Sequence, residues 1–463
     1  MTSLRPTRGL APYDPRTVSM LSFVAATPKF KDGSDTPRDY LERCLETIAM
    51  REPEVQAFAA IDPDAARHAA DESTERYKAG APLSVVDGMP VAIKDLFDTV
   101  DLPTQKGSPF FKDWNAGRDA AHVYALRKGG AIILAKGHTT EFGAGAPAPT
   151  RNPYDLSRTP GGSSSGPAAA VAAQMLPFAS ASHGRGSGIR PASYCGLYAL
   201  KPTYGAINRG GCDNGAYATG HMCTYAGTLE DCWVITHFLG RTAGPDPGCY
   251  GLFGPAPLPP AELPRRLIRL GMAGWAETDD ASKSAFEDCL RRLEAAGVAI
   301  LGADDDPRIA AYETTLQDMT ALYQGIALYD YRHPLASYRD RDASLMDERI
   351  LKGLERADGY TLDDYRTALD RQARFKAQHQ ALAALADGFI TLSSLGPASV
   401  GMDSGSAIYN ESSSVLGVPA YTLPLLAVGG MPLGVQLQGY CDGDALLTAY
   451  AGGITATVLG IPD

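Results

Sequence analysis

The sequence predicts an α/β protein in which helices cover both faces of a large mixed β-sheet. Three observations lead to this fold class. Residues 35–80 repeat apolar side chains at helical spacing, which indicates an N-terminal helical layer. Between residues 85 and 135, short apolar runs alternate with a helical pattern, as is typical of strands joined by crossover helices. Residues 305–387 are charged and roughly periodic, which predicts a helical insertion.

The first helix of the N-terminal layer is expected to begin near residue 35. Ser34 or Asp35 can cap it, and Pro37 suits the first turn, where a missing N–H leaves no hydrogen bond unmade. A second helix is expected from Asp64 to Tyr77.

The sheet itself is predicted from short apolar runs bounded by turn residues. Strands are expected at 91–93 and 131–135, with a helix over 120–128 between them. Strand-like runs return after the insertion and precede a final helix from Ala445, so strands on both sides of the insertion are expected to share one sheet. These later runs cover residues 389–392, 420–423 and 433–437.

We interpret residues 1–463 as one domain, because a chain of this length can bury one large α/β core. The N-terminal helical layer takes about residues 1–80. The catalytic core takes about 85–250 and 388–463, and a variable, largely helical region that shapes the substrate pocket takes about 255–387.

Composition narrows the classes of partner. The chain has 53 acidic and 42 basic residues, whereas nucleic-acid binding needs a concentrated basic face. No apolar run approaches the length of a membrane span, and the N-terminus carries no convincing signal peptide, so we expect a cytoplasmic protein without a membrane partner. The eight cysteines form no C-x-x-C pair or His/Cys metal spacing, and neither a metal nor another cofactor is expected.

Residues 143–222 are unusually rich in glycine, serine, proline and threonine. A flexible linker is the common interpretation of such a composition. Here an apolar, helix-like segment, Ala168 to Ala173, separates glycine and serine clusters at 160–166 and 183–191, which a linker would not contain. Neither cluster matches a phosphate-binding glycine motif. A serine framed by small residues instead favours nucleophilic catalysis, because backbone N–H groups can converge on an oxyanion.

No histidine is an evident base for such a serine, and His183 lies only four residues before Ser187. Lys94 ends an apolar strand and could project into a pocket, where desolvation would keep its amine neutral. A lysine at a strand end is more often solvated, so the pattern alone leaves both interpretations open.

Taken together, these segments resemble the amidase signature family. Gly88 to Asp95 match its G-[VM]-P-[VI]-[AG]-[VI]-K-D segment, Gly161 to Ala170 largely match its glycine-serine block, and Gly186 to Gly205 match its nucleophile segment. The resemblance covers about residues 35–250 and 388–455. It implies the large mixed sheet of the amidase signature fold.

The resemblance also implies a role for each matched residue. Ser187 is the implied nucleophile, and Lys94 is the base that takes its proton through Ser163, which follows a cis peptide bond after Gly162. The two serines are 24 positions apart, the separation that the family shows. Substrate contacts are expected from Arg190, Ser164 and Gly162. The implied oxyanion hole consists of backbone N–H groups of Gly184, Arg185, Gly186 and Ser187.

Departures from the family pattern concern the rim of the site. His183 stands where aspartate is common, and Arg185 where glycine is common. Arg190 follows the nucleophile by three positions, which resembles malonamidase-like members, where this arginine holds a substrate carboxylate. Guanidinium suits that task because it binds carboxylates bidentately. Bracing of the loop by Arg190 through backbone carbonyls is an equally open alternative.

The implied function is hydrolysis of the C–N bond of a small linear amide, with or without a carboxylate, through an acyl-enzyme. Two alternatives stay open: an amidotransferase-type subunit that releases ammonia from glutamine for a partner, and a non-catalytic binding protein of the same fold. We expect a homodimer. In the unmatched middle, Tyr323, Tyr329 and Tyr331 could line the pocket or only pack a helical layer.

Overall fold

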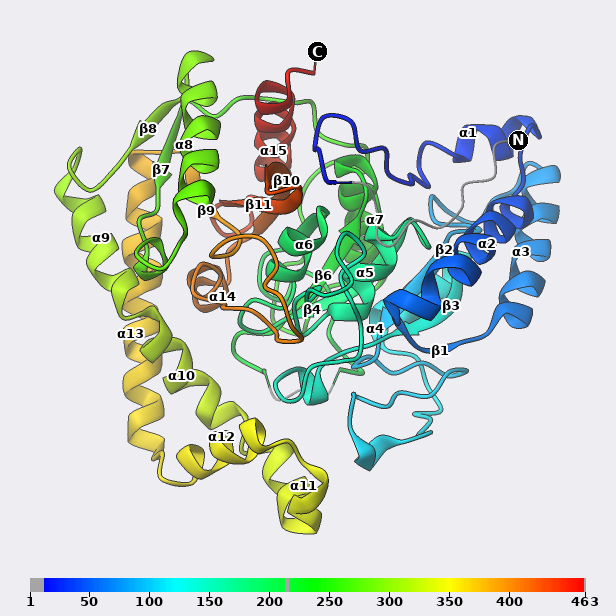
Figure 1. Cartoon of the computed structure of the whole chain (residues 1–463), viewed down its shortest axis with the longest axis horizontal. Helices are drawn as coiled ribbons and strands as arrows, with labels where there is room; N and C mark the ends of the chain where they lie inside the picture. Colours follow the sequence, from blue (N-terminus) through cyan, green and yellow to red (C-terminus); the bar gives the residue numbers. More distant parts are fainter. Residues whose placement is uncertain (1–11, 213–215, 462–463) are drawn as a thin grey trace.

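The computed structural model describes residues 12–212 and 216–461. Its strands are β1 (Phe58–Ile61), β2 (Pro90–Lys94), β3 (Ile132–Gly137), β4 (Phe178–His183), β5 (Tyr198–Lys201), β6 (His221–Ala226), β7 (Arg266–Arg269), β8 (Ala299–Leu301), β9 (Gly388–Leu392), β10 (Ala420–Val428) and β11 (Met431–Gln438). They form one mixed sheet in the order β1-β3-β2-β4-β6-β5-β10-β11-β9-β7-β8. Strands from both sides of the insertion therefore share a sheet, as predicted (Figure 1).

Helices surround this sheet (Figure 1). They are α1 (Thr27–Asp32), α2 (Pro37–Val55), α3 (Pro63–Lys78), α4 (Ala121–Lys128), α5 (Ser165–Ala172), α6 (Arg190–Cys195), α7 (Leu229–Thr242), α8 (Asp280–Ala295), α9 (Pro307–Gln317), α10 (Met319–Asp330), α11 (Leu335–Asp342), α12 (Glu348–Asp358), α13 (Leu362–Ala381), α14 (Glu411–Leu416) and α15 (Asp444–Leu459).

The strand β2 shows how both faces become covered. Side chains alternate between the faces of a strand. Ala92 packs in a core cluster with α5 and α6, whereas Val91 and Ile93 pack in another with α4 and α7. The next residue on the Ala92 face is Lys94, which places its side chain on the side of α5. The predicted fold class, with helices on both faces, is confirmed.

The N-terminal layer differs in two details from the sequence prediction. Thr36 caps α2, not Ser34 or Asp35, because its hydroxyl accepts the backbone N–H of Asp39 at 3.0 Å. Pro37 occupies the first turn, as predicted. Residues 35–80 are also not helical throughout, since β1 separates α2 from α3 and pairs with β3 at the edge of the sheet.

The glycine- and serine-rich stretch is a packed part of the core and no linker. Every residue of α5 is buried. A Cβ on Gly166 would lie 2.2 Å from the carbonyl oxygen of Ala57, so only glycine lets the first turn of α5 approach the neighbouring backbone this closely. This close packing fixes the serines that precede α5 against the end of β2.

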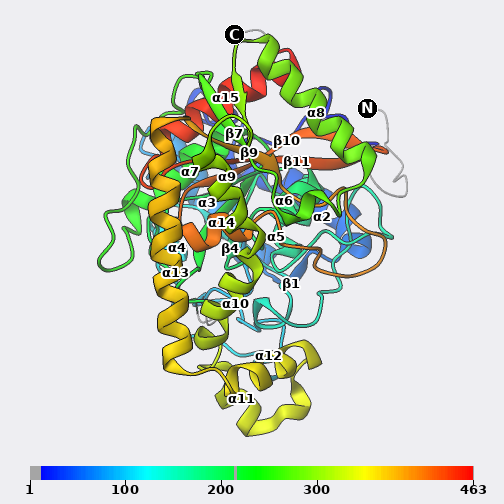
Figure 2. The ribbon, with the colours of Figure 1, turned by 90° about the vertical axis from the view of Figure 1, so that its left-hand side faces the viewer.

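The insertion is helical, as predicted, and comprises α9 to α13. These helices form an arm that extends from the body of the molecule, with α10 packed against α12, α13 and α14 (Figures 1 and 2). In the described ranges, no helix combines the length and apolarity needed to cross a bilayer. The same residues bring together no cluster of histidine, cysteine and acidic side chains that could hold a metal ion.

Candidate active site

Lys94 lies at the carboxyl end of β2, between β3 and β4, and its side chain is fully buried. Its Nζ lies 2.7 Å from the hydroxyl of Ser163 and 2.8 Å from those of Ser164 and Ser182. Burial lowers the pKa of Lys94 from 10.5 to about 7, because the charged form loses its hydration. The structure thus contradicts the solvated interpretation of this lysine.

No carboxylate among the described residues pairs with Lys94. The adjacent Asp95 makes a buried ion pair with Lys136 at 3.2 Å instead. Lys136 Nζ also donates to the Phe97 carbonyl at 2.9 Å and to the Thr104 hydroxyl at 2.7 Å. The amine of Lys94 is therefore surrounded by neutral hydroxyl groups, which favour its uncharged form more than a carboxylate would.

The three hydroxyls around Lys94 define where its proton can move. A protonated amine can donate to all three, whereas a neutral amine has two N–H donors and one acceptor lone pair. Ser164 donates to the Ser182 carbonyl at 3.2 Å, so Ser164 accepts from Lys94 in either state. When Lys94 is neutral, the hydroxyl that donates to it is therefore that of Ser163 or Ser182.

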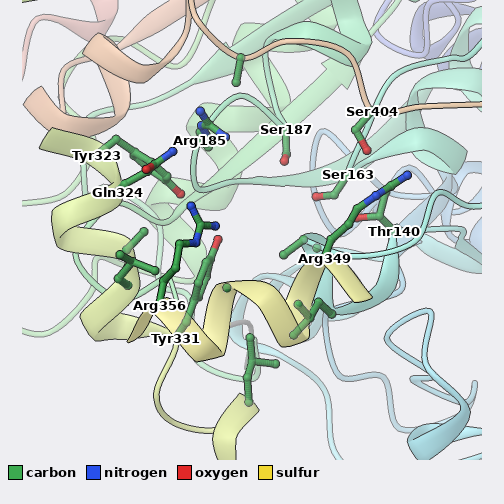
Figure 3. A pocket seen from close by; sticks show the side chains of 18 of the residues that line it. Thr140, Ser163, Arg185, Ser187, Tyr323, Gln324, Tyr331, Arg349, Arg356 and Ser404 are labelled. Carbon is green, nitrogen blue, oxygen red and sulfur yellow. The ribbon is translucent and has the colours of Figure 1, made fainter. Parts of the chain in front are cut away.

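Ser163 and Ser187 face a common cavity of about 400 Å³ (Figure 3). The Gly162–Ser163 peptide is cis, as the resemblance implies. Ser187 is 9% exposed, which is enough to reach the cavity from the turn between β4 and α6. Within the described residues, no hydrogen bond joins the hydroxyls of Ser163 and Ser187. Such contacts often form only when substrate binds.

The turn that carries Ser187 presents unpaired backbone donors. The N–H groups of Arg185, Gly186 and Ser187 have no hydrogen-bond acceptor within the described part of the chain. The hydroxyl of Tyr225, on β6, donates to the Ser187 carbonyl at 2.8 Å and holds the turn from behind. Free amides next to a serine hydroxyl can stabilise negative charge on a carbonyl oxygen.

His183 anchors the same turn. Its Nδ1 accepts the backbone N–H of Gly188 at 3.1 Å, and its Nε2 lies 2.7 Å from the hydroxyl of Ser414 on α14. Because Nδ1 accepts, the neutral ring carries its proton on Nε2. Burial, together with the nearby Lys201, holds the pKa of His183 well below its usual range. A neutral histidine can therefore supply the hydrogen-bond acceptor that an aspartate would provide.

The two arginines of the rim have different surroundings. Arg190 is 5% exposed, and its Nη2 donates to the Gly162 carbonyl at 2.5 Å, which is the bracing contact considered above. Its Nε and Nη1 have no partner among the described residues. Arg185 pairs with Glu411 on α14 at 2.5 Å and lies over the ring of Tyr323. Arg190 therefore braces the loop, and two of its nitrogen atoms are buried without a partner among the described residues.

The predicted substrate-contact residues divide into two groups. Arg190 lines the cavity, whereas Gly162 and Ser164 do not. Gly162 instead holds Arg190 through its carbonyl, and Ser164 contacts Lys94. A direct contact of Gly162 or Ser164 with substrate stays a prediction.

The far wall of the cavity comes from the insertion. Tyr323 and Tyr331 line it, as one of the two interpretations predicted, while Tyr329 stacks on Tyr365 with ring centroids 4.2 Å apart. Arg349 and Arg356 of α12 also line the cavity (Figure 3).

Three residues that shape the site were not predicted from the sequence: Ser182, Tyr225 and Glu411. Ser180 and Ser182 alternate along a buried strand, a pattern that could have indicated polar groups on one face. Tyr225 and Glu411 act through partners far away in the chain, and no local pattern marks them.

The chain belongs to the Amidase family, whose sequence model matches residues 39–357. The resemblance to the amidase signature is thereby confirmed. The match continues past residue 250 into the helical insertion, where the signature motifs gave no resemblance.

Relatives with a shared name cover the chain to different extents. A glutamyl-tRNA(Gln) amidotransferase subunit from Psychrobacter sp. (strain PRwf-1) is 30% identical over 451 residues, 88% of this chain and 90% of that protein. The protein of the same name from Leptospira interrogans serogroup Icterohaemorrhagiae serovar Lai (strain 56601) is 37% identical over 217 residues, 46% of this chain and 45% of that protein. The second alignment thus spans less than half of the relative.

Solved structures share the fold over nearly the whole chain. A 6-aminohexanoate cyclic dimer hydrolase complexed with substrate matches with a TM-score of 0.79 and 22% identity, covering 96% of this chain and 98% of that one. A peptide amidase in complex with chymostatin also gives a TM-score of 0.79, at 22% identity, covering 94% and 97%. These likenesses establish the amidase signature fold.

Proposed function

We propose that this protein hydrolyses the C–N bond of a small linear amide through an acyl-enzyme on Ser187. The observation that carries the proposal is the contact between Lys94 Nζ and Ser163 Oγ, 2.7 Å long, in a buried site whose cavity also holds Ser187. A buried amine with a pKa of about 7 can accept a proton near neutral pH, which an exposed lysine cannot do.

The reaction would proceed in two halves. Ser187 Oγ attacks the amide carbon while its proton passes to Ser163 Oγ, and the proton of Ser163 passes to Lys94 Nζ. The proton then returns by the same route to the leaving nitrogen, the C–N bond breaks, and an amine or ammonia departs. Water, deprotonated by the same relay, attacks the acyl-enzyme and releases the carboxylic acid and free Ser187.

The oxyanion of each tetrahedral intermediate would be stabilised by backbone N–H groups of the turn. We assign this role to Gly184, Arg185 and Gly186 together with Ser187. The amides of the last three have no other acceptor among the described residues, which supports the assignment.

Arg190 is proposed to hold a substrate carboxylate that lies close to the scissile amide, through Nε and Nη1, which are buried and have no partner in the described structure. Replacement of Arg190 by Met tests this role. If Arg190 holds a carboxylate as well as bracing the loop, the Met variant should raise the KM for malonamate more than that for propionamide, whereas loss of a brace alone would impair both amides equally.

An amidotransferase-type subunit is the second candidate, and the Psychrobacter relative favours it. Such a subunit would release ammonia from glutamine efficiently only with its partner present. Turnover of simple amides by the isolated chain would support the hydrolase. Activity confined to glutamine plus a partner would favour the amidotransferase. Homodimerisation and a cytoplasmic location stay predictions.

Labelling with a fluorophosphonate tests the nucleophile and the third alternative, a non-catalytic binding protein. The wild type should be labelled and Ser187→Ala should not, with turnover falling by about 10⁶-fold, as for removal of other serine nucleophiles. Ser344→Ala, an exposed serine outside the cavity, serves as the matched control and should behave as wild type. Unlabelled wild type, or residual turnover by folded Ser187→Ala, would contradict the assignment.

A further inference from the structure

The helix α12 carries two arginines on the cavity wall that faces the reactive serines. Arg349 and Arg356 are seven residues apart, two helical turns, which separates them by about 10 Å along the axis. Both line the cavity. In Figure 3, Arg349 reaches toward Ser163 and Thr140, and Arg356 stands beside Tyr331. The two guanidinium groups therefore flank the cavity rather than forming one cluster.

Neither guanidinium is neutralised in the described part of the chain. No ion pair is formed by Arg349 or Arg356 there, and Arg356 Nε makes only a 3.4 Å contact with the Lys352 carbonyl. Three of the four acidic side chains on or next to α12 have other partners, and the fourth, Glu355, forms no ion pair among the described residues. Glu348 pairs with Lys352 at 2.5 Å, Asp358 pairs with Arg339 at 2.7 Å, and the Asp347 carboxylate accepts the backbone N–H of Arg349 at 3.0 Å.

The cavity as a whole has an excess of positive charge. Its described lining includes four arginines and no acidic residue. Glu411 balances Arg185, and Arg190 is buried with two nitrogens that no described residue pairs. This excess occurs in a chain with a net charge of −11. A concave site with uncompensated positive charge concentrates anions.

Between the two arginines, α12 offers an apolar surface. Ile350 and Leu354 line the cavity from the same helix, and Leu328 and Leu335 continue this surface. A ligand that fits would have an apolar body and an anionic end. A planar carboxylate matches the guanidinium fork best.

We propose that Arg349 and Arg356 make the α12 wall of the cavity a carboxylate-binding surface, on which one of the two guanidinium groups receives the anionic end of the substrate. The substrate would be an amide whose apolar part ends in a carboxylate away from the scissile bond. This inference rests on the proposed amide hydrolysis and adds the substrate class. It concerns a position different from that of Arg190, which sits on the turn of the nucleophile and reaches only groups next to the scissile amide.

A chain-length series tests the proposal. The probes are the monoamides of dicarboxylic acids from malonamate to suberamate, each compared with the neutral alkanamide in which a methyl replaces the carboxylate. In the wild type, kcat/KM should favour the carboxylated member of the longer pairs by about tenfold or more, in line with a charge-assisted hydrogen bond. The preference should decline as salt is added.

The variants are Arg349→Gln, Arg356→Gln and both together, with Lys352→Gln as the matched control. Lys352 is on the same helix and carries the same charge, yet lies outside the cavity lining. The double variant should lose the preference through a higher KM for the longer carboxylated amides, with neutral amides changed less than about twofold, since the relay is untouched. Lys352→Gln should keep the preference. An undiminished preference in the double variant, or no preference in the wild type at any length, overturns the proposal.

A binding measurement separates this inference from the proposed function. Calorimetry with suberamate on Ser187→Ala needs no turnover. The dissociation constant should rise about tenfold when Arg349→Gln and Arg356→Gln are added, by the same hydrogen-bond reasoning, and an equal constant would refute the subsite. Absence of turnover and of fluorophosphonate labelling in the wild type would refute the hydrolase instead, whatever the binding result.

Discussion

The basic side chains at the cavity differ in their surroundings between the catalytic core and the helical insertion. In the core, Lys94 is fully buried and contacts three hydroxyls, and the neighbouring Asp95 and Lys136 pair with each other. In the insertion, Arg349 and Arg356 are exposed and have no charged partner among the described residues. Both regions border the same cavity (Figure 3).

This contrast suggests bond cleavage as the role of the core and substrate binding as the role of the insertion. Burial changes the acidity of a group and fixes its geometry, both of which bond cleavage requires. Exposed, flexible cations attract a ligand without altering the reaction. Changes in the core should therefore alter kcat, and changes in the insertion should alter KM.

After Ser187→Ala, the largest effect is expected for Lys94→Met. Loss of the base should lower kcat by about 10⁴-fold, the upper range for general-base catalysis. The pKa of Lys94 is lower in the folded chain, about 7, than its usual 10.5, so below pH 7 folding has to bury a protonated amine. Methionine removes this penalty, and thermal unfolding at pH 6 should show an equal or higher Tm. If Lys94→Met folds and keeps a kcat near that of the wild type, changes in the core do not act on kcat and the proposed difference between core and insertion is wrong.

The pH profile of the wild type should show the same base. Only neutral Lys94 accepts a proton, so kcat should fall about tenfold per pH unit below a pKa of about 7 and level off above it. Initial rates between pH 5 and 9 measure this limb. The variant Lys352→Gln, in the insertion, should leave its midpoint in place. A rate that rises as pH falls would exclude Lys94 as the base.

His183→Ala tests whether the anchor of the nucleophile turn belongs to the catalytic region. The Gly188 N–H would lose its acceptor, a loss worth about 1–3 kcal/mol, so kcat should fall by about ten- to one-hundred-fold with KM little changed. His183→Asn, whose side-chain oxygen can accept this N–H, should recover part of the rate. Equal rates for the Ala and Asn variants would argue that His183 only fills space.

The smallest effect on the reaction is expected for a matched pair of leucine truncations. The pair tests whether the helical insertion and the sheet core unfold separately. Leu354 belongs to a small cluster around α12, separate from the core cluster that holds Leu134. Each Leu→Ala change removes about 2–5 kcal/mol of local packing. Leu354→Ala should loosen α12 in hydrogen exchange and raise KM a few-fold, whereas Leu134→Ala should lower the Tm of the whole protein. A common response in both assays would mean that arm and core unfold together.

The sequence predicted the core better than the rim. The apolar run ending in Lys94 and the apolar helix between two glycine and serine clusters are local patterns that the sequence shows directly. The roles of Lys94, Ser163 and Ser187 came from the resemblance to the amidase signature family, which includes the spacing of the two serines. Tyr225 and Glu411 could not be assigned roles, because their partners lie far away in the chain. The short strand β1 was missed because its four residues, between two helices, carry little periodicity.

The same limit explains why Arg190 was left with two alternatives. Its sequence position predicts a carboxylate anchor, and only the fold brings the Gly162 carbonyl to its Nη2. Arg349 and Arg356 gave no signal either, because charged residues on a periodic helix usually face solvent. They line the cavity only because α12 packs against α10 beside the reactive serines.

The register of β2 has a consequence for how the fold tolerates change. Lys94 and Asp95 are chain neighbours, yet one contacts the serines and the other Lys136. A slip of one residue exchanges the faces of a strand. Here a slip would bring a carboxylate to the serines and leave two lysines facing each other. Electrostatic repulsion would thus disfavour the shifted pairing of β2. A single insertion or deletion in β2 should therefore prevent the chain from folding, and not only slow the reaction.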